Sequence, residues 1–343
     1  PLVMYKPAST VQLSPRGIPS PEFAPSRQFF PTEIFISFPP DRVPMVLHPP
    51  PKSELSPITT PADILPSIMA FPNSLPENSK YKKTIGLQLW TVRNQMQKDK
   101  LKTLKAISDA GYYQVELGDT NDAAELLPIC KDLDLAVTPS FLNWQAVCTP
   151  DAKGVPALDK VLEQAQKANL KHLVFGYINK PNRQTADQFK RYAETSNQFG
   201  EKCAKSGIQL CYHNHSFEFA PLDNGKTGFD LLIEELDENH CKFELDVFWA
   251  KIGGWDPIET LKRLNGRVSQ VHLKDLKNGS KTCFDEGQVP HEAFKELGNG
   301  SIDMAKVMAV SEEIGVEQCH VEQDQSPNPI VSIGQSINHL NSL

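Results

Sequence analysis

Two patterns of hydrophobic positions alternate from residue 83 to the C-terminus. Short apolar runs of strand length are separated by longer segments in which apolar residues recur at helical spacing. For example, Leu101, Leu104 and Ile107 share one face of a predicted helix that stops at Gly111. The apolar runs predict eight strands, at 84–92, 112–118, 136–141, 171–178, 208–215, 241–249, 268–275 and 318–324.

The segments between these runs predict eight helices. Asp256 and Pro257 illustrate the start signals, as an N-cap residue followed by proline in the first turn. A (β/α)₈ TIM barrel needs about 250 residues, close to the span from 83 to 343, so we expect this fold. The alternative, an open doubly wound sheet, would carry a glycine-rich turn after its first strand, and none follows 84–92. The predicted helices cover 101–111, 123–135, 155–170, 185–207, 228–238, 256–266, 303–315 and a segment from about 330.

The first 82 residues have a different composition. Eighteen of the chain's 28 prolines fall within 1–80, and no helical or strand period persists there. Proline removes a backbone donor and restricts the residue before it, so we expect 1–82 to form a disordered tail before a barrel in 83–343. A proline-rich segment that binds a partner is the alternative.

Composition narrows the class of protein. The net charge of −7 argues against a nucleic-acid partner, which requires a basic surface. The seven cysteines are scattered without a CxxC pair, which favours reduced thiols and a cytoplasmic location. No apolar stretch reaches the roughly 20 residues of a membrane span, so no membrane partner is expected.

Side chains of the kinds that bind metal ions lie near the ends of the last four predicted strands. Asp246, His272 and Glu322 mark strands six to eight, and His213 or His215 marks strand five, with Glu218 shortly after. In a barrel these strand ends converge on one central site. Carboxylates combined with imidazoles suit Mn²⁺, Mg²⁺, Co²⁺ or Zn²⁺, so we predict a divalent metal site there.

Several segments around these residues resemble the sugar phosphate isomerase/epimerase family. These are xylose isomerase-like barrels, whose relatives include inosose dehydratases, ketose 3-epimerases and endonuclease IV nucleases. The resemblance implies that Asp246, His272 and Glu322 hold one divalent ion. The fourth ligand is usually a glutamate at the end of strand five, and by position it falls on His213 here, with His215 or Glu218 as alternatives. The motifs are HNHSFEF (213–219), ELDVFWAKIGGWDP (244–257), VHLKD (271–275), ELGNGSID (296–303) and VEQD (321–324).

The resemblance also implies chemistry on a small-molecule sugar or polyol, either isomerisation or epimerisation of a ketose or sugar phosphate. A metal would polarise a carbonyl, and a nearby base would remove the adjacent proton. Loss of a β-substituent would instead give a dehydratase or lyase acting on an inosose or 3-keto-glycoside. A nuclease would need more ligands and a basic groove. The candidate catalytic residues are Glu322, Glu218, His215 and Lys274, with Glu322 and either Glu218 or His213 as the acid/base groups.

Weaker candidates lie at other strand ends. Glu116 could face the substrate, or form a structural ion pair. Trp90 and Trp249 could provide an apolar wall against the C–H face of a sugar. Lys274 could hold a hydroxyl or phosphate, or pair with a barrel carboxylate. The sequence leaves the sugar, the metal and the formation of a homo-oligomer open.

Overall fold

The computed structural model describes residues 79–343, in which eight strands close a parallel barrel. The neighbour order is β1-β10-β7-β6-β5-β4-β3-β2, which confirms the predicted fold. The barrel strands are β1 (Gly86–Gln88), β2 (Gln114–Leu117), β3 (Ala136–Phe141), β4 (His172–Phe175), β5 (Gln209–His213), β6 (Cys241–Asp246), β7 (Val268–Leu273) and β10 (Gln318–Val321).

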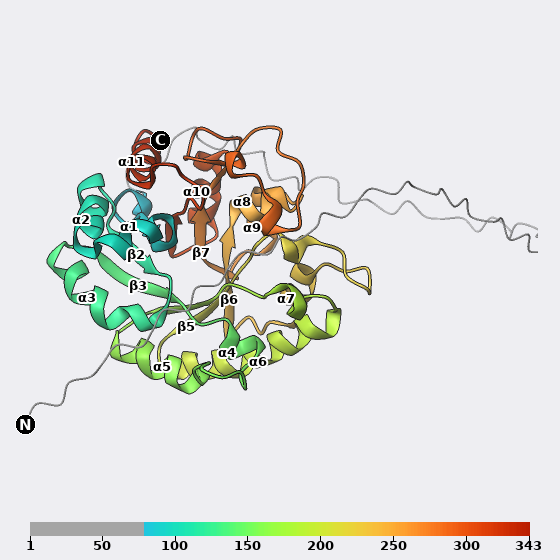
Figure 1. Ribbon diagram of the computed structural model, residues 1–343. Helices are drawn as coiled ribbons and strands as arrows, with labels where there is room; N and C mark the ends of the chain where they lie inside the picture. The colour runs from blue at the N-terminus through green and yellow to red at the C-terminus, as the bar shows by residue number, and fades with distance from the viewer. Residues whose placement is uncertain (1–78) are drawn as a thin grey trace, which may run out of the picture. The chain divides into compact units, whose positions relative to one another are not determined.

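Helices follow the strands and surround the barrel (Figure 1). Each of the eight predicted helices is present, and three shorter ones, α1, α4 and α8, were not predicted. Among the described residues, no helix is both long and apolar enough to cross a membrane. The helices are α1 (Arg93–Lys98), α2 (Lys100–Ala110), α3 (Ala123–Asp132), α4 (Gln145–Cys148), α5 (Leu158–Lys167), α6 (Ala186–Lys205), α7 (Gly228–Glu235), α8 (Val247–Ile252), α9 (Pro257–Arg263), α10 (Met304–Glu313) and α11 (Pro329–Asn341).

The helix ends follow local sequence signals. Asp256 caps α9 by accepting bonds from two backbone N–H groups of the first turn. Thr185 and Gln188 form a reciprocal capping box at the start of α6. Gly111 ends α2 with a φ of 100°, a left-handed conformation that glycine adopts without steric cost.

The predicted tail lies outside the described residues up to residue 78. Residues 79–82 belong to the first described turn, η1 (Lys80–Lys83). Within it, Tyr81 is fully buried and its hydroxyl donates a 2.7 Å hydrogen bond to the Val316 carbonyl. The division of the chain near residue 82 remains a prediction.

Seven of the eight barrel strands are shorter than the apolar runs that predicted them, and two of these end at a capping side chain. The run 84–92 leaves the sheet at Gln88, whose side chain accepts a bond from the Trp90 N–H and starts a 3₁₀ turn. The run 241–249 leaves it at Asp246, whose carboxylate caps α8 by accepting from the Trp249 N–H at 2.9 Å. In both places a polar side chain ends the strand beside the barrel mouth.

Polar side chains alternate with apolar ones along the strands that carry the site. Glu244 and Asp246 of β6 flank Leu245, and His320 and Glu322 flank Val321. All these residues are buried. Because alternate residues of a strand face opposite sides of the sheet, the polar set points into the barrel and the apolar set packs against the helices.

The glycine-rich segment 296–303 surrounds an internal carboxylate. Asp275 accepts hydrogen bonds from the N–H groups of Gly298, Gly300 and Ile302 at 2.9–3.0 Å. A Cβ at Gly300 would lie 2.2 Å from Asp275 Oδ1, so only glycine fits there. The segment follows a two-stranded hairpin formed by β8 (Asp275–Leu276) and β9 (Phe294–Lys295). With Asp275 in place, these N–H groups are not available to a phosphate.

Candidate active site and metal centre

Four side chains from four strands converge at the C-terminal end of the barrel. His213 ends β5, Asp246 ends β6, His272 lies in β7 and Glu322 directly follows β10. Each offers one ligand atom, and these atoms all lie within 4.8 Å of one another. All four residues are buried. The arrangement has the donor set and the spacing required to hold one divalent cation.

The His272 ring is fixed from both sides. Its Nε2 lies 2.6 Å from a Glu116 carboxylate oxygen and 3.2 Å from Glu244, and its Nδ1 lies 3.1 Å from Glu322. Burial lowers the pKa of His272, but the Glu244 and Glu116 carboxylates outweigh this effect and raise it well above its usual value. With Nε2 held by carboxylates, Nδ1 is the nitrogen that faces the ligand cluster.

Glu244 also orients His213. The His213 Nδ1 lies 3.2 Å from a Glu244 oxygen, which leaves Nε2 as the nitrogen available to a ligand. Burial, reinforced by nearby His272, lowers the pKa of His213 to about 3. A neutral imidazole is the form that binds metals.

Lys274 lies among three carboxylates at the rim of this cluster. Its Nζ is 2.6 Å from Glu322, 3.1 Å from Asp246 and 3.1 Å from Asp324. Burial lowers the pKa of this ammonium, but the three carboxylates raise it above its usual value, so Lys274 is charged. Burial raises the pKa of Glu322, but Lys274 and His272 lower it well below its usual value. Of the two interpretations of Lys274, a contact with substrate or an ion pair with barrel carboxylates, the ion pair is the one present in this structure.

A cavity of about 680 Å³ opens above the cluster. His213, Glu322 and Lys274 form part of its floor, and loops from around the barrel form its walls. Its volume falls within the roughly 300–1,000 Å³ that is typical of small-molecule sites. The aromatic residues that line it are Trp90, Phe141, Trp144, Tyr177, Trp249 and Phe294.

The predicted site residues divide into two groups. Those that line the cavity or its ligand cluster are His213, His215, Asp246, His272, Lys274, Glu322, Trp90 and Trp249. Glu218 and Glu116 do not line the cavity, so the structure argues against direct contact between either residue and the substrate. Glu218 is fully buried behind the strand-five turn, and Glu116 lies beneath His272.

Glu218 instead fixes the position of His215. Its carboxylate accepts bonds from the His215 N–H at 3.0 and 3.1 Å and from the Tyr212 hydroxyl at 2.8 Å. Burial raises the pKa of Glu218 to about 8. In this structure Glu218 therefore contacts Tyr212 and the His215 backbone, and its predicted role as a base or ligand stays a prediction.

Sequence reasoning missed three polar residues of the site, of which Glu244 and His320 are buried and Asp324 is partly buried. Glu244 and His320 each precede a predicted ligand by two positions, so strand alternation places them on the same face and one layer deeper. Asp324 follows Glu322 by two positions and lines the cavity. A search for polar residues two positions from each predicted ligand would have found all three.

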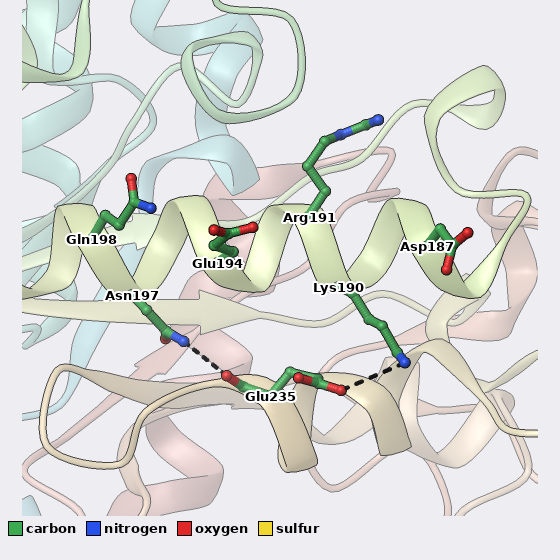
Figure 2. Close-up of a pocket in the computed structure, with 7 residues that line it drawn as sticks. All are labelled: Asp187, Lys190, Arg191, Glu194, Asn197, Gln198 and Glu235. Carbon is green, nitrogen blue, oxygen red and sulfur yellow. Dashed lines mark hydrogen bonds and ion pairs between the residues drawn. The ribbon is translucent and has the colours of Figure 1, made fainter.

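A second hollow lies on the surface between α6 and α7 (Figure 2). Lys190 pairs with Glu235 at 3.9 Å, and the Asn197 side chain donates to the Glu235 carbonyl. Figure 2 shows Arg191 and Gln198 pointing away from Glu235. These polar groups do not converge on a common point, so the hollow lacks the features of an active site.

Comparison with known proteins shows to which family the chain belongs. The family model described as xylose isomerase-like TIM barrel matches residues 104–343. The chain belongs to this family. An inosose dehydratase from Clostridium perfringens is 30% identical over 155 residues, which cover 42% of this chain and 51% of that protein. The chain thus spans about half the length of the first curated relatives it matches.

Longer matches extend over most of the barrel. An inosose dehydratase from Mesomycoplasma hyopneumoniae is 24% identical over 271 residues, 71% of this chain and 88% of that protein. A sugar phosphate isomerase/epimerase from Parabacteroides distasonis superposes with a TM-score of 0.62 at 20% identity, covering 79% of this chain and 98% of that one. The 3-keto-D-glucoside 4-epimerase of E. coli gives 0.56 at 16% identity, covering 77% and 100%. The structural matches establish the shared barrel fold.

Proposed function

We propose that the protein is a divalent-metal-dependent enzyme that removes a proton next to a carbonyl of a sugar or related polyol, acting as an isomerase or epimerase. The observation that carries this proposal is the ligand cluster of His213, Asp246, His272 and Glu322 on the cavity floor, with donor atoms within 4.8 Å. Relatives described as epimerases and dehydratases support the same class of chemistry.

The residues present fit a divalent cation. Two imidazoles and two carboxylates suit Mn²⁺, Co²⁺ or Zn²⁺, and less closely Mg²⁺. Among the described residues, Asp246 Oδ2 accepts no hydrogen bond, and its closest polar contact is the ion pair with Lys274 Nζ at 3.1 Å, so a cation already occupies this side of the cluster. When bound, a divalent cation would polarise a substrate carbonyl and make the adjacent C–H group more acidic.

The chain's own residues supply the proton transfer. Glu322 and His215 both line the cavity, and either can accept a proton from the substrate carbon. His215 Nδ1 is buried without a hydrogen-bond partner. Lys274 Nζ, 2.6 Å from Glu322, can donate to a substrate oxygen. Return of the proton to the opposite face gives an epimer, and return to the neighbouring carbon gives an isomer.

Dehydration is the second candidate. The curated relatives that match this chain are named inosose dehydratases. The same proton abstraction leads to elimination if a hydroxyl on the next carbon departs with a proton. Lys274 and Asp324, 3.1 Å apart at the rim, are placed to supply that proton.

The experiment uses ketoses and inososes deuterated next to the carbonyl. We expect the label to exchange with solvent when Mn²⁺ or Co²⁺ is present, and Glu322→Gln to lower the exchange rate by at least about 100-fold, in the range for loss of a positioned acid/base group. Glu194→Gln, on the exposed face of α6, is the matched control and should exchange as wild type. Loss of water from the product would identify the dehydratase. Full activity after confirmed metal removal would contradict the proposal.

A further inference from the structure

The cavity is larger than a single sugar ring requires. Its volume of about 680 Å³ equals that of roughly twenty water molecules at about 30 Å³ each. A hexose has only about twelve non-hydrogen atoms, which pack more densely than water. A ring placed over the ligand cluster would therefore leave space toward the cavity rim.

A line of ring contacts leads from the ligand cluster to that space. The His213 ring lies 5.2 Å from His215, His215 lies 5.6 Å from Tyr177, and Tyr177 lies 5.6 Å from Trp144. The last two rings meet edge to face and are only partly buried, so they offer aromatic surface to a ligand. We call Tyr177 and Trp144 the aromatic wall.

The aromatic wall is held in place before any ligand binds. The Tyr177 hydroxyl donates to a Glu286 oxygen at 3.0 Å. Arg183 binds both oxygens of the same carboxylate at 2.7 and 2.9 Å; Arg183 is buried and Glu286 is partly buried. Glu286 lies in the long loop between β8 and β9, so this pair also fixes the loop against the segment after β4. A fixed surface loses little conformational entropy when a ligand binds.

Among the described residues that line the cavity, carboxylates outnumber the lysine and arginine side chains that could bind an anionic ligand. Of the described residues that line it, Arg93 and Lys274 are the lysine and arginine members. Arg93 donates to the carbonyls of Trp90 and Asp324, and Lys274 is shared among three carboxylates. Four carboxylates line the same cavity, those of Asp119, Glu286, Glu322 and Asp324.

We propose that the aromatic wall is a second subsite, which binds a ring attached to the sugar, and that the substrate is an uncharged glycoside with a keto group on its sugar ring, rather than a sugar phosphate. The inference rests on the proposed function only for the position of the first ring over the ligand cluster. Trp249 supports that position, because it lines the cavity and its buried indole Nε1–H, a hydrogen-bond donor, has no partner among the described residues.

The test compares methyl and phenyl β-glycosides of glucose and of galactose. Within each pair, the two compounds differ only in that a phenyl ring replaces the methyl group. Dissociation constants are measured by calorimetry or saturation-transfer NMR, with Mn²⁺ and again with EDTA. We expect the phenyl glycoside of the preferred sugar to bind about three- to tenfold more tightly than its methyl partner, the gain of one aromatic contact. Trp144→Ala should abolish this preference and leave methyl glycoside binding unchanged.

Tyr113→Ala removes an exposed aromatic ring at the opposite end of β2 and should change neither affinity. Equal affinity for the two glycosides, failure of both pairs to bind, or equal weakening of both by Trp144→Ala would overturn the subsite. Tighter binding of glucose 6-phosphate than of methyl glucoside would overturn the uncharged substrate. A phenyl preference that persists in EDTA, together with metal-independent turnover, would retain the subsite and reject the metal-dependent function.

Discussion

Glu244 acts on the candidate metal centre through the two imidazoles that it contacts. Its carboxylate is fully buried and lies 3.2 Å from both His213 Nδ1 and His272 Nε2. Glu244→Gln keeps the shape but removes the charge that orients both rings. We expect Mn²⁺ or Zn²⁺ affinity to fall about 10- to 100-fold, as for other residues that support metal ligands. Metal titration by calorimetry measures this effect, with Glu194→Gln as control. If the variant binds the metal as tightly as wild type, Glu244 contributes only to packing.

Lys274 balances carboxylates that would otherwise repel one another. Lys274→Met keeps most of the side-chain volume but leaves Asp246, Glu322 and Asp324 without their shared cation. Loss of one partner of a buried ion pair costs about 3–5 kcal/mol. We therefore expect the melting temperature of the metal-free protein to fall by roughly 10 °C, and added Mn²⁺ to restore much of the loss.

The exposed variant Lys190→Met is the control for this measurement. A metal-free Lys274→Met protein as stable as wild type would show that the carboxylates do not depend on the ammonium. Stability that Mn²⁺ fails to restore would argue that the cation and the ammonium do not share these oxygens.

The sequence pointed to the four side chains that the structure brings together, and less well to the residues that support them. His213, Asp246, His272 and Glu322 stand out because polar groups are unexpected in apolar strand ends. Glu116 and Glu218 carry the same kind of signal but face a histidine ring and a backbone N–H group. The orientation of Glu116 depends on the layer of the barrel in which it lies, and that of Glu218 depends on the course of the turn after β5. No local sequence pattern encodes either feature.

The turn after β5 contains Glu218, whose carboxyl group keeps its proton to a higher pH in the folded protein than in the unfolded chain. Burial raises the pKa of Glu218 from its usual value of 4.5 to about 8. A raised carboxyl pKa stabilises the fold at low pH, and this contribution is lost as pH rises from about 4.5 toward 8. The loss is on the order of a few kcal/mol.

We therefore expect Glu218→Gln to remove this part of the pH dependence. The free energy of unfolding, measured by urea titration from pH 5 to 8.5, should fall more steeply for wild type than for the variant. Parallel curves for the two proteins would show that Glu218 has a similar pKa in the folded and unfolded states.

At the level of elements, the order of strands and helices was predictable because each has its own hydrophobic period. Two of the errors at strand ends share a cause, because these ends at the barrel mouth are set by side chains that cap the next turn. Gln88 and Asp246 end β1 and β6 in this way, although apolar residues continue beyond each. The hairpin of β8 and β9 was missed because each strand has only two residues.

For the molecule as a whole, the boundary of the folded barrel can be located by two truncations that differ by four residues. A chain that begins at residue 79 retains Tyr81, which is fully buried and bonded to the Val316 carbonyl, and the Lys80 N–H that donates to Glu312. A chain that begins at residue 83 loses both contacts. Removing 1–78 takes away a segment whose proline content disfavours regular structure, so we expect the melting temperature to stay within about 2 °C.

Removing 1–82 has a different expected result. Burial of one large apolar side chain contributes about 1.5–3 kcal/mol, and its hydrogen bond about 1 kcal/mol more. For a domain of this size that corresponds to a fall of roughly 5–15 °C in melting temperature. Tyr81→Ala in the full-length chain should reproduce most of this fall, which separates the effect of the side chain from that of chain length. If both truncated chains have the melting temperature of the wild-type protein, Tyr81 contributes little to the stability of the barrel. If the chain from residue 79 is already destabilised, the proline-rich segment supports the fold, contrary to its composition.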